Sequence, residues 1–145
     1  MSLTEDIEEY FPYLYEENRL KTYKSWVFNK NKPCSVDKMA EAGFIFIGSK
    51  QEPDAVKCFF CWKNLDGWEE ADNPWKEHLK HAPNCSFAKL QKAQANITLK
   101  QFIDLRQELL NKIVNYYKDK QISELSRLAK KTRNSIKKII CRLIS

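Results

Sequence analysis

The stretch CFFCWKNLDGWEEADNPWKEHLKHAPNC, residues 58–85, decides the fold of this chain. It opens with the C-x2-C pair Cys58 and Cys61 and ends with His78, His81 and Cys85. Three thiolates and one imidazole fill the tetrahedral shell of a structural zinc ion. The stretch therefore predicts one structural Zn²⁺, and such a metal can supply much of the folding free energy of a small domain.

The residues alone leave the fourth zinc ligand open. His78 and His81 lie three residues apart on a predicted helix, so both imidazoles can point the same way. The spacing from His81 to Cys85 also resembles a finger-type ligand pair. Four protein ligands leave no open coordination position, which argues against a catalytic zinc. A nucleophilic cysteine is also disfavoured, because the thiolates are occupied and no His/Asp relay is evident.

Charge is divided unevenly along the chain. Residues 1–85 carry 11 Lys and Arg against 15 Asp and Glu, a net charge of −4. Residues 86–145 carry 14 against 4, a net charge of +10, and the two sum to the +6 of the whole chain. From Ser126 to Ser145 there are seven basic residues and no acidic one. An acidic first part and a basic second part indicate different partners for each.

Composition excludes several classes of protein. With 43% hydrophobic residues and only three glycines in 145 residues, the chain can build a core and does not read as disordered. No apolar run approaches the roughly 20 residues of a membrane helix, and the first residues lack the basic region and apolar core of a secretory signal, so we expect neither. We therefore expect an intracellular, reducing location without a membrane, with Cys34 and Cys141 as free thiols.

Local signals predict short helices and strands in the first ninety residues. Aromatic residues at helical spacing favour a first helix. A serine at the N-cap and a glycine at the C-terminal end delimit a second helix. One proline opens a third helix and another ends it. Short apolar runs favour three strands. The helices are expected over residues 16–26, from Ser35 through Ala42 to the stop at Gly43, and from Pro74 to Pro83; the strands are expected over residues 44–47, 55–59 and 64–68.

The second part of the chain predicts one long helix. Thr98 and Gln101 form a capping box, and no Gly or Pro follows before Leu143. An apolar stripe is interrupted at residues 118–121, where a break is an open alternative. A continuous helix of roughly 65 Å, at about 1.5 Å per residue, cannot fold back along a small domain. Its stripe must then meet another chain or remain exposed.

Five quoted motifs together resemble the baculoviral inhibitor-of-apoptosis repeat (BIR) over about residues 15–90. They are Arg19-x3-Tyr23-x2-Trp26, Met39-Ala40-Glu41-Ala42-Gly43-Phe44, Asp54-x-Val56-x-Cys58-Phe59-Phe60-Cys61, Leu65-x2-Trp68 and Glu77-His78-x2-His81-x3-Cys85. The resemblance implies an α+β fold: a zinc-stapled BIR domain, with a three-stranded antiparallel sheet and short helices, followed by one long C-terminal helix. It assigns the zinc to Cys58, Cys61, His78 and Cys85 and leaves His81 free.

The same resemblance implies a domain organisation. Residues 1–14 form an N-terminal segment, residues 15–90 the BIR domain, residues 91–97 a linker and residues 98–145 the long amphipathic basic helix. One repeat followed by one helix is similar to the survivin-like or deterin-like branch of this family.

The family binds peptides with free N-termini in a groove beside the third strand. An apolar floor takes a small first side chain, carboxylates attract the α-ammonium group, and cationic groups hold a phosphate by charge-assisted hydrogen bonds. Carried over by position, the floor is Leu65 and Trp68, the carboxylates are Asp66 and Asp72, and the cationic groups are Lys63 and His81.

Some positions have a second reading or depart from the family. A position in the core is the alternative interpretation of Trp68, and it is the predicted position of Trp26, Phe44, Phe59 and Phe60. Asp66 is shorter than the glutamate usual there, and Ala71 replaces another acidic residue, so the grip on the ammonium group is expected to weaken. The pattern assigns no role to Trp62 or Trp75.

This branch implies a non-enzymatic adaptor of the chromosomal passenger complex. Its head reads a histone tail that is phosphorylated near its N-terminus, and its helix bundles with helices of borealin and of the inner centromere protein, which brings in Aurora B kinase. The expected locations are the nucleus and centromere, then the spindle and midbody, and the cytoplasm, in support of chromosome segregation and cytokinesis. The positions expected at the partner helices or at a homodimer seam are Phe11, Leu99, Phe102, Leu109, Ile113 and Ile136.

The sequence also bears on three other functions. The BIR resemblance also permits an inhibitor of apoptosis that binds caspases or processed N-terminal motifs. A ubiquitin ligase needs a second metal-ligand set, and after Cys85 only Cys141 and no histidine remain. The basic end of the helix can bind nucleic-acid phosphates weakly and without sequence preference, or it is a solvated face.

Overall fold

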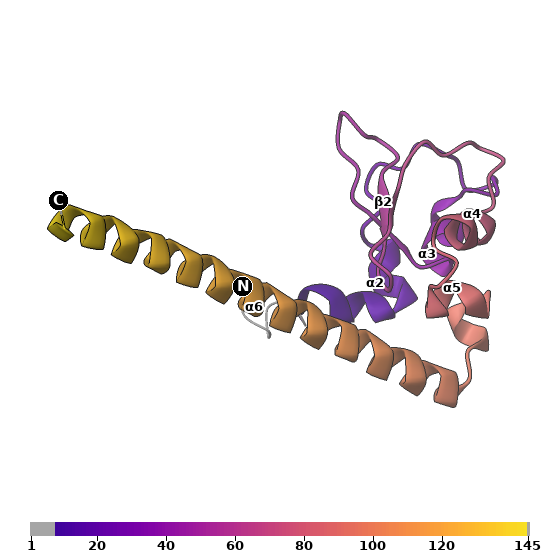
Figure 1. Ribbon diagram of the computed structural model, residues 1–145. Helices are drawn as coiled ribbons and strands as arrows, with labels where there is room; N and C mark the ends of the chain where they lie inside the picture. The colour runs from indigo at the N-terminus through magenta and orange to yellow at the C-terminus, as the bar shows by residue number, and fades with distance from the viewer. Residues whose placement is uncertain (1–7, 145) are drawn as a thin grey trace.

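A three-stranded antiparallel sheet lies in the first part of the molecule, and Figure 1 labels one of its strands, β2 (Val56–Cys58). In the computed structural model, which describes residues 8–144, the strands follow the order β1-β2-β3. Phe44 pairs with Cys58 across the first two strands, and Val56 pairs with Leu65 across the last two. The strands are β1 (Phe44–Phe46), β2 (Val56–Cys58) and β3 (Asn64–Leu65). The predicted sheet is confirmed, with shorter strands than expected.

The third strand ends three residues earlier than predicted. Gly67 turns the chain with a φ of +71°, a conformation that suits glycine. The backbone N–H of Trp68 then donates to Asp54 Oδ2 at 2.8 Å instead of to a neighbouring strand. The indole consequently stands beyond the end of the sheet.

Short helices surround the sheet; the first predicted one is shorter than expected, and three others, over residues 11–14, 86–90 and 94–96, were not predicted. The helix predicted over residues 16–26 ends at Leu20. The hydroxyl of Thr22 donates to the carbonyl of Arg19 at 2.7 Å and accepts the N–H of Phe46 at 2.8 Å, so it ties the chain to β1. The elements are η1 (Phe11–Leu14), α2 (Glu16–Leu20), α3 (Val36–Glu41), α4 (Pro74–His81), α5 (Ser86–Leu90) and η2 (Gln94–Asn96).

The predicted helix boundaries at α3 and α4 are largely confirmed. Ser35 occupies the N-cap of α3, although its side chain makes no capping hydrogen bond. Asn73 caps α4 by accepting the N–H of Lys76 at 3.1 Å, with Pro74 in the first turn. Gly43 follows α3 at a φ of +92°, where a Cβ would lie 2.6 Å from the Phe87 ring. Both backbone and packing therefore require glycine there.

A buried arginine joins the elements beneath the sheet. Arg19 donates from Nε to the carbonyl of Ala40 at 2.7 Å and from Nη1 to that of Tyr13 at 2.8 Å. Its guanidinium lies over the Phe59 ring, 4.8 Å from the centroid. Burial lowers the pKa of Arg19 to about 10. Phe44, Phe59 and Phe60 are fully buried as expected, while Trp26 is only partly buried at the edge of the core.

One uninterrupted helix, α6 (Leu99–Ile144), forms the rest of the described chain. Its 46 residues span roughly 69 Å at about 1.5 Å per residue. The predicted capping box is present, because Thr98 Oγ1 accepts the N–H of Gln101 at 3.2 Å and Gln101 Oε1 accepts the N–H of Thr98 at 3.1 Å. The helix does not break at residues 118–121.

Only the first part of α6 packs against the head, by which we mean residues 8–97 (Figure 1). Leu105, Leu109 and Ile113 are its buried residues and belong to the same core as the sheet. Residues 118–144 are all exposed, and they extend roughly 40 Å from the head at about 1.5 Å per residue. The expectation that the helix cannot fold back along its whole length is confirmed.

Candidate metal centre and peptide groove

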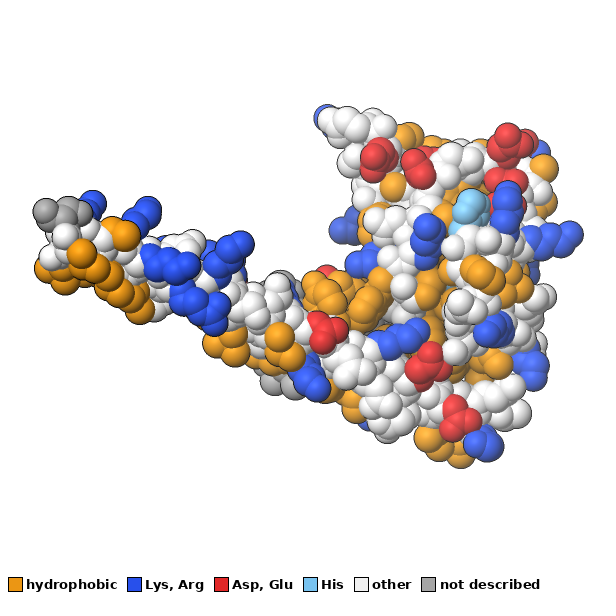
Figure 2. Space-filling model, viewed as in Figure 1, with side chains coloured by type: hydrophobic (Ala, Val, Ile, Leu, Met, Phe, Trp, Pro, Cys, Tyr) orange, Lys and Arg blue, Asp and Glu red, His pale blue; other side chains and the backbone are white. Residues whose placement is uncertain are grey.

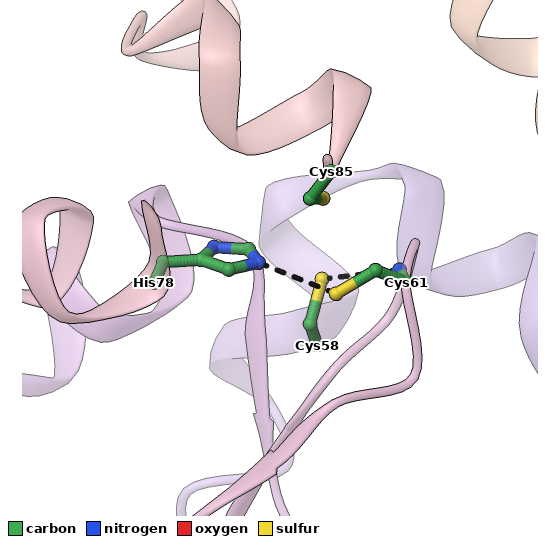
Figure 3. Close-up of side chains that lie close together, drawn as sticks. All are labelled: Cys58, Cys61, His78 and Cys85. Carbon is green, nitrogen blue, oxygen red and sulfur yellow. Dashed lines mark hydrogen bonds between the residues drawn. The ribbon is translucent and has the colours of Figure 1, made fainter. Parts of the chain in front are cut away.

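Four side chains from separate parts of the head converge on one point (Figure 3). Cys58 ends β2, Cys61 follows in the next turn, His78 lies within α4, and Cys85 precedes α5. Their ligand atoms all lie within 4.8 Å of one another, and Cys61 Sγ is 3.5 Å from His78 Nε2. The sulfurs of a tetrahedral zinc site, with Zn–S bonds near 2.3 Å, stand about 3.8 Å apart. The cluster therefore fits one zinc ion.

Hydrogen bonds around the cluster orient its ligands. The carbonyl of Ala42 lies 2.8 Å from His78 Nδ1, which selects the tautomer that leaves Nε2 free for a metal. The backbone N–H groups of Phe60 and Cys61 point at Cys58 Sγ, at 3.3 and 3.4 Å. Such donors stabilise a thiolate in a buried place. The hydrogen bonds around the ligands therefore support metal binding, in addition to the ligand set itself.

Cys58, Cys61 and His78 have pKa values shifted from their ordinary ranges. Burial raises the pKa of the Cys58 thiol well above its ordinary value. Hydrogen bonds with Cys58 and Cys85 hold the pKa of Cys61 well below its ordinary range. Burial alone lowers the pKa of His78, but hydrogen bonds with Cys61 and Cys85 outweigh it and raise the pKa to about 9. A bound divalent cation lets all three thiolates be charged together.

The second histidine stands apart from the metal cluster. His81 is exposed, and its Nε2 lies 3.4 Å from Glu77 Oε2 on the same helix. His78, by contrast, is fully buried. The structure thus brings His78 to the three cysteines and leaves His81 at the surface, as the family resemblance implied.

A groove of about 320 Å³ lies between the end of the sheet and α4. It collects five of the six residues predicted to bind a peptide, and Lys63 is the exception. Lys63 is exposed, and its carbonyl accepts the N–H of Cys58 at 2.9 Å. The lining consists of Leu65, Asp66, Gly67, Trp68, Glu69, Asp72, Glu77, Lys80 and His81.

The groove is acidic. Four carboxylates line it, against the single ammonium group of Lys80. That ammonium already pairs with Glu77 at 3.0 Å. The Asp72 carboxylate is held in place because Oδ2 accepts the N–H of Glu69 at 2.8 Å. Such a lining suits a cationic group such as a peptide N-terminus.

Trp68 belongs to both the groove and the core. Its side chain is only 7% exposed, and its ring packs edge-on against Phe44 at 5.4 Å between centroids. Its indole Nε1 is buried and, within residues 8–144, has no hydrogen-bond partner. Trp68 can therefore be both a core residue and part of the groove floor, since one face of a core indole can form that floor.

Several groove residues were missed from the sequence. Asp54 fixes the backbone of Trp68, although it was quoted only as part of a motif. Glu77 lies three residues before Lys80 and four before His81, so each of these two residues neighbours Glu77 on the helix surface. That helical spacing was the signal that could have identified them. Glu69 follows Trp68 directly and carried no periodic signal.

The two tryptophans without a predicted role are structural. Trp62, at a φ of +62°, packs between Tyr10 at 5.3 Å and Tyr116 at 5.5 Å. It therefore connects the start of the described chain to α6. Trp75 stacks on Phe87 at 5.5 Å and donates from Nε1 to Glu41 at 3.3 Å.

The residues expected at a helical interface fall into three groups. Leu109 and Ile113 are buried against the head, so they are not accessible to a partner while α6 stays docked. Phe11 and Phe102 are partly buried. Leu99 and Ile136 are exposed, at 75% and 50%. Among residues 8–144, no helix has both the length and the apolar character needed to cross a membrane.

Comparisons with known proteins agree with this architecture. Residues 19–89 match the BIR family, described as the Inhibitor of Apoptosis domain. The mouse protein "Baculoviral IAP repeat-containing protein 5" is 44% identical over 128 residues, which cover 87% of this chain and 91% of the mouse protein. The rat protein of the same name is 39% identical over 125 residues, covering 86% and 87%. "Baculoviral IAP repeat-containing protein 5.2-A" of Xenopus laevis is 44% identical over 88 residues, covering 61% and 56%.

Proposed function

The chain belongs to the BIR family, as a single-repeat protein of the survivin type, and we propose that it is a non-enzymatic adaptor whose head binds peptides by their free N-termini. The observation that carries this proposal is the acidic groove beside Trp68. The buried metal cluster has four protein ligands, so its role is to hold the groove in shape.

The groove supplies the two features that an N-terminal residue requires. Its carboxylates, such as Asp66 and Asp72, attract an α-ammonium group, which a residue inside a chain lacks. Its floor of Leu65 and Trp68 accommodates a small apolar side chain. A volume of about 320 Å³ is enough for a few residues and not for a folded partner.

The peptide we propose is a histone N-terminal tail phosphorylated on a nearby threonine. Lys80 and His81 lie at the groove and can each donate to a phosphate. Both contact Glu77 in the free protein, so phosphate binding must compete with that carboxylate. Lys63 lies outside the lining, and we assign its predicted role to Lys80.

The exposed part of α6 supports the second half of the adaptor role. Its apolar side chains have no partner within the described chain and fit a bundle with borealin-like and inner-centromere-protein-like helices. The assembly would carry Aurora B kinase to the centromere, and later to the spindle and midbody. The exposed residues in question are Ile122, Leu125, Leu128, Ile136, Ile139 and Leu143.

Peptide titration tests whether the groove binds a phosphorylated histone tail. Three versions of one histone N-terminal peptide are compared by calorimetry: unmodified, threonine-phosphorylated, and phosphorylated with an acetylated N-terminus. We expect the phosphorylated peptide to bind at least about tenfold more tightly, as one charge-assisted contact allows. Acetylation should abolish binding, because it removes the ammonium charge.

A matched pair of variants locates the phosphate contact. Lys80→Gln should remove most of the gain from phosphorylation. Lys76→Gln, on the same helix but outside the groove lining, should leave it intact. No gain from phosphate in the unaltered protein would overturn the histone proposal while leaving N-terminus binding open.

An inhibitor of apoptosis that binds processed N-terminal motifs is the second candidate. The groove has more carboxylates than cationic groups, so it favours an ammonium group without requiring a phosphate. A peptide beginning Ala-Val and a direct caspase assay separate the two functions. Tighter binding of that peptide than of the phosphorylated histone tail, or caspase inhibition, would favour this candidate.

A further inference from the structure

The exposed part of α6 keeps most of its basic residues and its apolar residues on different sides, although Lys118 and Arg133 lie on the apolar side. At about 100° per residue, the apolar side chains fall on one side of the helix and most basic ones on the opposite side. Figure 2 shows the basic side chains along one flank of the projecting helix and the hydrophobic ones along another. The opposite, basic side carries Arg127, Lys130, Lys131, Lys137, Lys138 and Arg142.

This basic face, as we call that set, is not neutralised within the described chain. Arg127 pairs with Glu124 at 2.7 Å. The other five residues have no ion pair within residues 8–144, and all five are exposed. No acidic residue occurs after Glu124. A row of uncompensated cations roughly 18 Å long, from Lys130 to Arg142, is therefore presented to solvent.

We propose that the basic face binds the phosphate backbone of double-stranded nucleic acid without sequence preference. A duplex carries one negative charge per about 1.7 Å of its axis, so a row of lysines finds phosphates in any register. Lys131, Lys138 and Arg142 follow one another on a single line along the helix, with steps of about 10 and 6 Å. The side chains are long and exposed, which suits point contacts to phosphates and not the reading of bases.

The arrangement favours a duplex over an anionic membrane. A helix in a membrane interface also carries basic residues on its polar side and buries its apolar side among lipids. A membrane would therefore cover the apolar side, which the proposed adaptor role assigns to partner helices, whereas a duplex needs only the basic side. A duplex on the basic face leaves the apolar side free for the partner helices of the proposed adaptor.

Charge also confines the duplex to the projecting helix. Residues 1–85 carry a net charge of −4 and residues 86–145 a net charge of +10. The net negative first part of the chain therefore attracts a duplex less than the basic helix does, and residues 118–144 hold the basic face clear of the head. This inference does not depend on histone binding, because it concerns a different surface.

Fluorescence anisotropy with a short labelled DNA duplex and the full chain tests the proposal. The test variant is Lys131→Glu/Lys138→Glu/Arg142→Glu. The control is Lys24→Glu/Lys30→Glu/Lys76→Glu, which makes the same change in net charge at exposed positions of the head. Circular dichroism verifies that both variants keep the helix, and Gln replaces Glu at the same positions if either does not.

The expected result has two parts: how strongly binding to the duplex depends on salt, and which residues carry that binding. Three phosphate contacts, one each from Lys131, Lys138 and Arg142, predict a roughly 40-fold loss of affinity between about 50 and 200 mM salt. The test variant should lose most of the binding and most of that salt dependence, while the control keeps both. Equal losses in the two variants would mean that net charge alone governs binding, and would overturn the proposal.

Vesicles rich in phosphatidylserine are the second probe. We expect weaker binding to vesicles than to the duplex. Strong binding to vesicles that falls with Ile139→Ser but not with the lysine changes, together with little binding to DNA, would assign this helix to a membrane surface and overturn the proposal.

Discussion

At the scale of single residues, burial of the Cys34 thiol makes the stability of the fold depend on pH. The thiol is fully buried, and that burial raises its pKa from 9.0 to about 12. Between these values the unfolded chain loses the proton while the folded chain keeps it, so stability falls as pH rises. Burial also raises the pKa of Tyr23, whose hydroxyl donates to the carbonyl of Phe44 at 3.1 Å, and this acts in the same direction.

Urea denaturation near pH 8 and near pH 10 measures this effect. We expect the unaltered chain to lose stability across that interval, and Cys34→Ala to lose less. The comparison is made between slopes, because the substitution itself lowers stability at both pH values by leaving a cavity. Identical slopes in the two proteins would contradict the assignment to Cys34.

Asp54 controls the groove through one hydrogen bond. Its Oδ2 accepts the N–H of Trp68 at 2.8 Å. Asp54→Ala leaves that donor without a partner, which costs about 1–3 kcal/mol of stability and frees the indole that forms the floor. Peptide affinity should fall while zinc stays bound, as measured by calorimetry and metal analysis. Asp54→Asn keeps an oxygen acceptor and should lose less; an Asn variant as weak as the Ala variant would point instead to the charge of Asp54.

At the scale of elements, zinc binding joins β2, α4 and α5, which have few residues each. A ligand variant such as Cys85→Ser removes one of four bonds, and structural zinc sites contribute roughly 10–16 kcal/mol of binding free energy to folding. We expect loss of bound zinc and of the cooperative unfolding transition, with the residual helicity of α6 retained.

Two controls accompany this zinc experiment. Cys141→Ser changes a cysteine outside the cluster and should keep one zinc per chain. Chelation of the unaltered protein should reproduce the effect of Cys85→Ser. A head that unfolds cooperatively at the same temperature after chelation would show that the metal is not structural.

Element types were easier to predict than their ends. The sheet, the long helix and the helices near Ser35 and Asn73 follow from periodicity and capping residues. The end of α2 does not, because it depends on a hydrogen bond from β1 to Thr22, which is 24 residues away in sequence from Phe46. The early end of β3 depends likewise on Asp54 reaching Trp68. Long-range contacts of this kind leave no periodic signal.

The candidate site, too, was predicted only in part from the sequence. The cysteine and histidine spacing predicted the metal cluster, and the family resemblance chose His78. The groove was predicted in outline, but Lys63 lies outside its lining and Lys80, which was not predicted, lies within it. The lining combines residues from the end of the sheet and from α4, and position in the sequence does not show which residues of two elements meet; only the assembled fold does.

At the scale of the whole molecule, α6 has two parts with different surroundings. The first part completes the core of the head through Leu105, Leu109 and Ile113. The second part, residues 118–144, touches nothing in the described chain through a buried side chain. Stability and peptide binding should therefore depend on the first part alone, and partner binding on the second.

Two truncations test this division. A chain that ends at residue 117 keeps every buried residue of the helix, so we expect the zinc content, melting temperature and peptide affinity of the full chain. A chain that ends at residue 97 also loses the three buried side chains, whose burial is worth roughly 5 kcal/mol or more in total, and should melt much lower. Only the full chain should bind the duplex and the partner helices. A shortened chain ending at 117 that loses peptide affinity would mean that the projecting helix acts on the groove, and the two parts would then not be independent.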